Sequence, residues 1–334
     1  MKKYQTFINI SISITIALLL FLLVYRKIDF SQIWYYLRHN SVRYDLLIIS
    51  VFIEALGNAL RGLRWNMQIK PLAEVKAKSY IAILSTLGSY TISLIIPRLG
   101  EIWRCSTIAK KERISFPSLL GTLIPDRFAD FVVMFFLLVI SFSFFFGDSI
   151  QLLSTLDFSN SKIAVLCQNL WFWGIGAAIL LSIILLFRFG LSRIIKEKVY
   201  SFFRRFLDGI RSFRLIEQKW RFMVYTIGMY FFYFGGFYIC FYAFDFTHSL
   251  GISAGLLAFI MGTLAVALPV QAGIGAWHFM VITALSIFGV SHNDAGIFAL
   301  VVHTLQTIGT AVLGLIAIFF LSLIPTNKEK KQEM

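Results

Sequence analysis

The sequence predicts an all-α polytopic membrane protein with about six full spans, two re-entrant broken helices that enter from opposite faces, and a possible inverted repeat. The first observation behind this is composition: 58% of the 334 residues are hydrophobic and 14% are charged, whereas a soluble domain carries about 25% charged residues. The second is length, because several apolar runs are near the ~20 residues that cross about 30 Å of hydrocarbon. The third is that proline and glycine interrupt two of these runs.

Eight hydrophobic segments follow one another along the chain. They fall at about 7–25, 45–60, 79–97, 128–147, 171–189, 222–244, 251–290 (interrupted) and 297–324. The first exceeds the core of a signal peptide and no small-residue cleavage motif follows it, so we expect a retained span. No gap is long enough for a second domain. Residues 1–324 are therefore expected to form one transmembrane domain, and 325–334 a charged cytoplasmic tail.

Basic residues predict the orientation. The stretch from Arg188 to Arg221 holds ten Lys or Arg against three acids, and 98–127 is also basic, whereas 148–170 holds a single Lys. Cytoplasmic loops are enriched in Lys and Arg, so both termini are expected in the cytoplasm of a cell with a bacterial-type inner membrane. The net charge of +14 is spread between the apolar runs, which favours anionic lipid headgroups over nucleic acid as the partner.

The segment 190–221 contains aromatic residues at three- and four-residue steps among Arg and Lys. This spacing predicts an amphipathic helix on the anionic cytoplasmic surface. The alternative is a solvated connector helix.

Two apolar segments look re-entrant. The run 79–97 has basic flanks on both sides, and Pro97 and Gly100 mark its break, since proline removes a backbone donor and glycine tolerates unusual dihedrals. The run 251–290 is broken by Pro269, Gly273 and Gly275 between flanks that look external. The two hairpins would enter from opposite faces, as in inverted-repeat transporters.

The first polar cluster is Asn58, Arg61, Arg64 and Trp65. Residues 58, 61 and 65 share one helical face and Arg64 adjoins it. One interpretation of this cluster is structural: the arginines anchor the cytoplasmic end of the helix, as the positive-inside rule describes. The other is functional: a guanidinium group binds a lipid phosphate.

The second cluster, Pro97, Arg98, Gly100, Glu101 and Arg104, follows the first break. Charges at membrane depth are costly unless they pair or face water. A structural Glu101–Arg104 ion pair and a substrate or proton site are both compatible with this spacing.

The third cluster is Asp126, Arg127 and Asp130, where the two aspartates share one helical face. Asp126 is expected at the mouth of the next span, so helix capping is one interpretation. A charge-matched binding site is the other.

The fourth cluster surrounds the second break and contains Gln271, Gly273, Gly275, Trp277 and His278. Free N–H groups at the start of the following helix would form an anion site. His303 could meet His278 in the interior, although a hydrogen-bonded structural role for His303 is the alternative.

No metal site, cofactor or catalytic motif is predicted. The three cysteines, at positions 105, 167 and 240, have no metal-type or disulfide spacing. The sequence contains no Walker loop, nucleophile elbow or HExxH motif, so an enzyme is not the expected function.

Taken in order, the four clusters resemble the flippase-like transmembrane domain of lysylphosphatidylglycerol synthases, over about residues 5–324. The resemblance implies a stand-alone member, because no room is left for the soluble aminoacyltransferase domain. It rests on the family's Arg-rich end of the second helix, its P-x-x-GE-x-x-R segment, its acid-Arg-acid segment and its P-x-x-x-GIG element. The matching residues are Arg61, Arg64 and Trp65; Pro97, Arg98, Gly100, Glu101 and Arg104; Asp126, Arg127 and Asp130; and Pro269, Gly273, Ile274 and Gly275. The chain departs at His278, where many members have glutamate, and at His303, where arginine is common.

The resemblance implies movement or binding of a phospholipid or polyprenyl-phosphate lipid. The substrate site would comprise Arg61, Arg64, Arg98, Glu101, Arg104, Asp126, Arg127, Asp130, Gly273, Gly275, His278 and His303. One rival is a polyprenyl-phosphate-dependent glycosyltransferase with Glu101, Asp126 and Asp130 as metal or base groups. The other rival is a non-catalytic membrane protein that binds a cell-envelope synthase as its partner. A homodimer is also a possible oligomeric state.

Overall fold

The computed structural model describes residues 42–73, 78–144, 193–266 and 270–325, together with positions 15, 18, 21, 22, 24, 25, 36 and 38. These residues form helices and no strands. The longer helices are α3 (Tyr44–Ile69), α4 (Ser79–Ile95), α5 (Leu99–Glu112), α6 (Phe116–Phe144), α10 (Arg193–Arg211), α11 (Lys219–Ile239), α13 (Ile252–Val266), α14 (Ala276–Ile287) and α15 (His292–Ser322). The short elements are η1 (Lys70–Leu72), η3 (Ser212–Leu215), η4 (Cys240–Ala243), α12 (Asp245–His248) and η5 (Gln271–Gly273).

Among the described residues, three helical segments are long and apolar enough to cross a membrane: Tyr44–Leu72, Lys219–Ala243 and His292–Ser322. Three shorter apolar helical segments accompany them, Ser79–Ile95, Ile252–Val266 and Gln271–Ile287. At 1.5 Å per residue, the 17 residues of α4 span about 25 Å, less than the hydrocarbon core. This pattern is that of a helical membrane protein.

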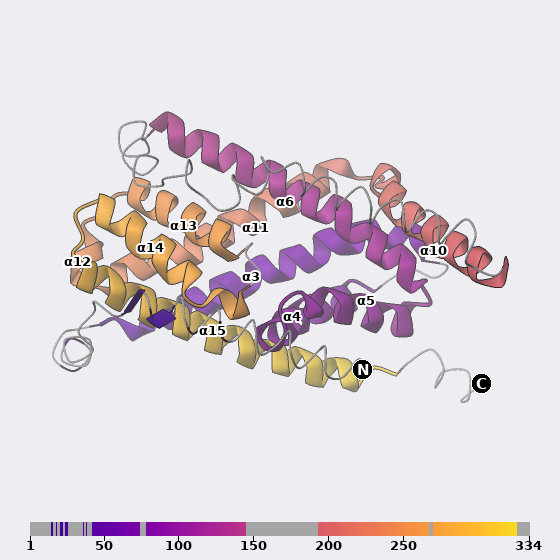
Figure 1. Ribbon diagram of the computed structural model, residues 1–334, viewed down its shortest axis with the longest axis horizontal. Coiled ribbons are helices and arrows are strands. Elements are labelled where there is room, and N and C mark those ends of the chain that lie inside the picture. The colour runs from indigo at the N-terminus through magenta and orange to yellow at the C-terminus, as the bar shows by residue number, and fades with distance from the viewer. Residues whose placement is uncertain are drawn as a thin grey trace, which may run out of the picture.

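The long helices α3, α6, α11 and α15 run along the long axis of the molecule (Figure 1). The short helix α12 lies at one end of this bundle and the basic helix α10 at the other. Helix α3 packs against α11, α4 and α15, so its side chains face neighbours on several sides.

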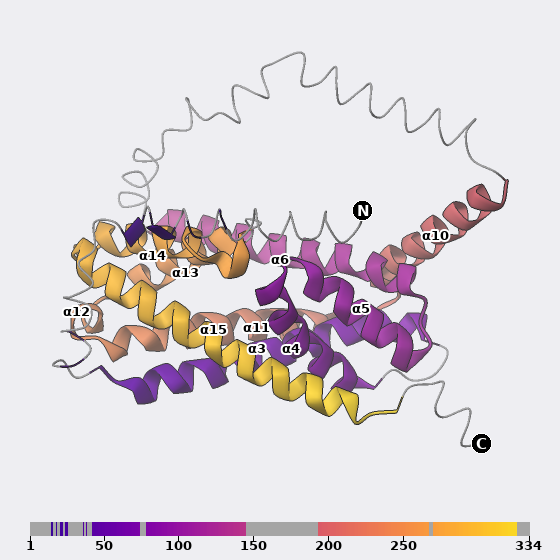
Figure 2. The same ribbon diagram turned by 60° about the horizontal axis from the view of Figure 1, so that its bottom comes forward.

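Two helical hairpins occupy opposite halves of the long axis (Figure 2). Helices α4 and α5 form one hairpin and α13 and α14 form the other, and the helices within each pair pack against each other. Their tips meet: the Gln271 side chain donates hydrogen bonds from Nε2 to Leu94 O and, at 2.6 Å, to Ile95 O. The chain reverses at the first tip through Arg98, which has a left-handed φ of 67°.

Close backbone approach holds the first hairpin together. A Cβ atom added to Gly62 on α3 would lie 2.6 Å from the Cα of Ile83 on α4. A Cβ atom added to Gly100 would lie far inside van der Waals contact with the carbonyl oxygen of Ser89. Glycine at these two positions therefore lets α4 pack directly against α3 and α5.

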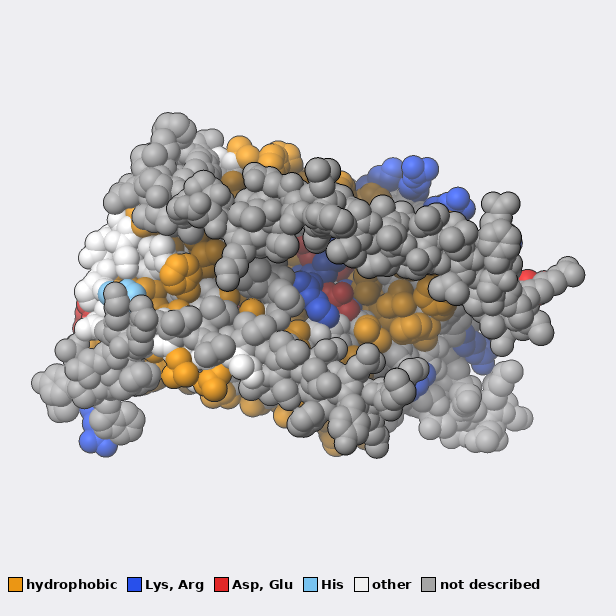
Figure 3. Space-filling view, in the orientation of Figure 1, with side chains coloured by type: hydrophobic (Ala, Val, Ile, Leu, Met, Phe, Trp, Pro, Cys, Tyr) orange, Lys and Arg blue, Asp and Glu red, His pale blue; other side chains and the backbone are white. Residues whose placement is uncertain are grey.

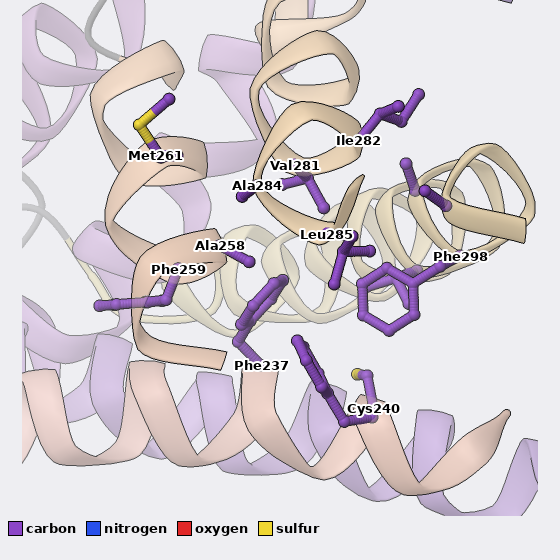
Figure 4. Close-up of a cluster of buried hydrophobic side chains, with 14 of the residues drawn as sticks. Phe237, Cys240, Ala258, Phe259, Met261, Val281, Ile282, Ala284, Leu285 and Phe298 are labelled. Atoms are coloured by element: carbon purple, nitrogen blue, oxygen red, sulfur yellow. The ribbon is translucent and has the colours of Figure 1, made fainter. Parts of the chain in front are cut away.

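The second hairpin is held by an aromatic core. Phe237 from α11 lies between Phe259 of α13 and Phe298 of α15, with ring centroids 6.1 and 6.0 Å away (Figure 4). Phe237, Phe298 and Leu285 are almost completely buried. Fully burying each such side chain stabilises the fold by about 1.5–3 kcal/mol.

Several predicted segments have different bounds in the structure. The run predicted at 45–60 belongs to a helix that continues to Ile69, and the run predicted at 128–147 begins at Phe116. Both helices are longer because the charged residues that seemed to end them lie inside the bundle and pair there. The segment 190–221 contains the predicted helix, α10. The spans predicted at 171–189 and for most of 7–25, the loop 148–170, Cys167, Pro269 and the tail from 326 lie outside the described residues.

Candidate functional site

The charged side chains of α3 lie in the interior of the protein. Arg61 and Arg64 are buried, with exposed fractions of 7% and 0%. They face α6, which presents Asp126 and Asp130 one helical turn apart. Asp130 is the middle residue of α6, about 21 Å from either end of this 29-residue helix. The cluster therefore lies midway along α6.

Arg64 bridges the two aspartates. Its Nη2 donates to Asp126 Oδ1 at 2.6 Å and to Asp130 Oδ1 at 2.7 Å. Arg61 forms an ion pair with Asp130, and its Nη2 lies 3.9 Å from Asp126 Oδ2. Charged groups out of water need such compensation, because an isolated buried charge is very costly.

The α4–α5 hairpin adds a third arginine from α5. Arg104 Nη2 lies 3.4 Å from Asp126 Oδ2, and its guanidinium carbon is 4.3 Å from the centre of the Trp65 ring. Trp65 in turn donates from Nε1 to Thr122 Oγ1 at 2.9 Å. Stacking on the indole and pairing with the carboxylate hold Arg104 in place.

The outer part of the cluster is partly exposed. Arg127 forms an ion pair with Glu101, and its Nη1 lies 3.6 Å from Asp130 Oδ2. The side chain of Arg127 is 46% exposed and Glu101 is 22% exposed, and Arg98 at the hairpin tip is exposed. Figure 3 shows basic and acidic side chains at the surface near the middle of the face that is turned toward the viewer. The cluster thus extends from a buried base to an open rim.

Positive charge exceeds negative charge in this cluster. Four guanidinium groups, from Arg61, Arg64, Arg104 and Arg127, are connected to three carboxylates, from Glu101, Asp126 and Asp130. Several buried donors are also unused: Nε and Nη1 of Arg64 and Nε of Arg104 have no hydrogen-bond partner among the described residues. A buried site with surplus positive charge and free N–H groups is suited to an anion with several oxygens.

Three sequence-based alternatives are wrong. Glu101 pairs with Arg127 and Arg104 with Asp126, so the described residues show no Glu101–Arg104 ion pair. Asp126 is ten residues into α6 and does not cap it. The arginines of α3 are buried ion-pair partners, not a surface anchor. Each error has the same cause, because the partners come from helices distant in sequence.

The two histidines meet at the second hairpin. The ring centroids of His278 and His303 are 4.6 Å apart. The two side chains therefore meet in the interior, which the sequence had offered as a possibility. His278 accepts a hydrogen bond at Nδ1 from Gly275 N–H at 3.2 Å, and His303 Nε2 lies 3.0 Å from Ala272 O. One N–H group of the expected anion site is therefore occupied by an imidazole of the chain itself.

The loop between α13 and α14 needs unusual backbone angles. Gly273 and Gly275 have φ of 73° and 83°. Ala272, which lies between Gln271 and Gly273, has a φ of 51°. Glycine adopts these angles readily. The loop places Gln271 against the tip of the first hairpin, so these glycines serve the junction between the hairpins.

Sequence reasoning missed three polar side chains near the cluster: Glu54, Tyr90 and Tyr233. Tyr233 donates to Asn58 Oδ1 at 2.7 Å. Glu54 and Tyr90 line a small cavity beside Asn58. The available signal was Glu54 itself, a carboxylate inside an apolar run and four residues before Asn58.

Comparison with protein families matches residues 10–314 to the lysylphosphatidylglycerol synthase TM region. Comparison with curated proteins and with solved structures found no match. The family match covers most of the chain, including all four polar clusters. The protein is accordingly a multi-pass membrane protein that belongs to the lysylphosphatidylglycerol synthase transmembrane-region family.

Proposed function

We propose that this protein is a flippase-like lipid transporter that binds the phosphate of a phospholipid or polyprenyl-phosphate lipid and moves it between leaflets. The observation that carries the proposal is the buried cluster, in which four guanidinium groups face three carboxylates. A phosphate would balance the surplus charge and accept hydrogen bonds from the unused donors of Arg64 and Arg104.

The exposed rim gives a headgroup a first point of contact. Arg98 and Arg127 lie at the surface near the hairpin tip, whereas Arg64 is fully buried. In the arrangement described, the base of the cluster is closed. A headgroup would bind at the rim and reach Arg64 only when α5 and α6 separate, which would break the Glu101–Arg127 and Arg104–Asp126 pairs.

The hairpins suggest how access could alternate. We propose that they are re-entrant, with α4 and α5 entering from the cytoplasmic face and α13 and α14 from the opposite face, as repeats of inverted topology. Their tips meet through the hydrogen bonds that Gln271 donates to Leu94 O and Ile95 O. Movement of one hairpin relative to the other would open the cluster to each leaflet in turn.

The glycosyltransferase alternative assigns Glu101, Asp126 and Asp130 to metal binding or base catalysis. In the structure each of these carboxylates is paired with arginine. Such pairing supports a role as counter-ions that hold the guanidinium groups in place. A transporter is therefore the better proposal.

The test is lipid translocation in proteoliposomes, using fluorescently labelled phosphatidylglycerol whose inner-leaflet pool is protected from a membrane-impermeant quencher. Arg64→Gln and Arg98→Ala are expected to reduce the protein-dependent rate at least tenfold. Arg43→Gln is the matched control, since Arg43 is an exposed arginine whose ion-pair partner among the described residues is the neighbouring Asp45.

Native mass spectrometry of co-purified lipids provides a second measurement. The wild-type protein is expected to retain a phosphate-bearing lipid that Arg64→Gln loses and Arg43→Gln keeps. Equal translocation rates in the wild-type protein and all three variants would show that the arginine cluster has no part in translocation. Lipid-linked sugar transfer that depends on Mg²⁺ and stops on chelation would favour the enzyme instead.

A further inference from the structure

A small cavity lies between α3, α4 and α15, on the side of Asn58 away from Arg61. Its polar lining consists of Glu54 and Asn58 from α3, Tyr90 from α4 and Thr310 from α15. The cavity volume is about 10 Å³, which is room for about one ordered water. Thr91 of α4, next to Tyr90, donates a hydrogen bond to Thr310 O at 3.1 Å and so ties α4 to α15 beside the cavity.

Glu54 is the acid of this cavity. It lies ten residues into α3, about 15 Å from the start of the helix. No residue that the structure describes forms an ion pair or side-chain hydrogen bond with its carboxylate. The charged carboxylates of the cluster all have arginine partners, whereas Glu54 lines the cavity and has no arginine partner among the described residues.

A polar stripe connects Glu54 to the cluster. Residues 54, 58, 61 and 65 recur at steps of four, three and four, which places them on one face of α3. Asn58 stands between Glu54 and Arg61 and is fixed by Tyr233. The charge state of Glu54 therefore acts on Arg61 along the same helix face, through a medium of lower dielectric than water.

We infer that Glu54 is a proton-binding site linked to anion binding in the arginine cluster, an inference that rests on the proposed function. A hydronium ion that reaches the cavity from bulk solvent gives its proton to the carboxylate: one O–H bond of hydronium breaks, the O–H bond of the carboxylic acid forms, and water is left behind. Ionised Glu54 offsets the surplus positive charge of the cluster and weakens phosphate binding. Neutral Glu54 restores that surplus, so a bound phosphate favours the protonated form and the proton favours phosphate binding equally.

The other titratable groups near Glu54 do not explain such a linkage. Tyr90 faces the cavity from α4, Tyr233 contacts Asn58 from α11, and Cys240 lies within electrostatic range of Glu54. Free phenols and thiols lose protons only above neutral pH. Thr310 and Leu313, which α15 contributes, do not titrate. Along α3, Arg61 is paired with Asp130.

The first test is infrared spectroscopy of the full chain in lipid nanodiscs as pH is lowered. Wild-type protein is expected to develop a carbonyl band of a protonated carboxylic acid that is missing from Glu54→Gln. Glu112→Gln, which changes a buried glutamate that is not part of the cavity lining, is expected to keep the band. A band that persists in Glu54→Gln overturns the assignment of the proton site.

The second test is binding of short-chain phosphatidylglycerol to the same proteins at several pH values. Wild-type affinity is expected to fall by up to tenfold per pH unit as pH rises, the limit for one linked proton. Glu54→Gln should bind tightly at every pH, while Glu54→Asp, which keeps the acid, should keep the dependence. Loss of the pH dependence in His303→Gln with its retention in Glu54→Gln would overturn the inference.

The two tests separate this inference from the proposed function. If the carboxylic acid band follows Glu54 but no phosphate-bearing lipid binds at any pH, the proposed function fails and the linkage fails with it, while the proton site stands. If lipid binds without any pH dependence, the proposed function stands and the linkage is wrong.

Discussion

The Arg64 guanidinium lies 2.6 Å from the Asp126 carboxylate, and both side chains are fully buried. Asp126 also accepts from Arg104, so one carboxylate compensates two buried arginines from different helices. The helices α3, α5 and α6 therefore meet at a single charged residue.

Asp126→Asn is expected to destabilise the protein by about 3–5 kcal/mol, because Arg64 and Arg104 lose a counter-ion in a buried position. The measurement is thermal or denaturant unfolding in detergent micelles. Asp45→Asn, which removes an exposed partner of Arg43, should change stability little. Equal effects of the two substitutions would show that burial does not set the strength of the Asp126 pairs.

Gly100→Ala is expected to disrupt the first hairpin, since the added methyl group would overlap the backbone of Ser89. Overpacking of this kind costs about 1–3 kcal/mol. Unfolding temperature and lipid translocation should both fall. Gly235→Ala is the control, because a Cβ atom at this helical position meets nothing within 4 Å. Normal behaviour of Gly100→Ala would mean that α4 and α5 can separate without loss of function.

Gln271→Leu is expected to uncouple the two hairpin tips, since two hydrogen bonds to the carbonyl groups of Leu94 and Ile95 are lost. The expected loss is about 1–2 kcal/mol, with faster amide hydrogen exchange at 96–99 and 270–275. Gln68→Leu is the matched control: this buried amide has no hydrogen-bond partner among the described residues. Unchanged exchange in Gln271→Leu would show that the tips are held by other contacts.

Helix α10 is expected to bind an anionic membrane surface. Tyr200 and Phe203 are 70% and 57% exposed, beside the exposed Arg204 and Arg205. Amide exchange across 193–211 should be slower in nanodiscs with anionic lipid than in zwitterionic ones, and salt should reduce the difference. Phe203→Ser should reduce the protection through lost apolar contact. Identical exchange in both lipids would favour a solvated connector helix.

The helices and the breaks were predictable from local sequence. Pro97 and Gly100 mark the first reversal, and Gly273 and Gly275 mark the second, because backbone preference is a property of single residues and their neighbours. The meeting of His278, which follows the second break, with His303, in the last span, was also a possibility that the sequence offered. The bounds of α3 and α6 were not predicted correctly. Charged residues such as Arg61 and Asp126 usually lie at the ends of apolar helices, and their burial could be recognised only once their ion-pair partners were known.

By itself, the sequence determined that the chain is helical and membrane-embedded, that it breaks at two places, and that it carries four clusters of polar residues along its length. Hydrophobic run length and backbone preference act locally, so they can be read from order along the chain. Only the tertiary structure decided which charges pair: Glu101 with Arg127, Arg104 with Asp126, and Arg64 with both aspartates. The reason is that Coulomb interactions and burial depend on distance in space, and packing of α3, α5 and α6 sets those distances.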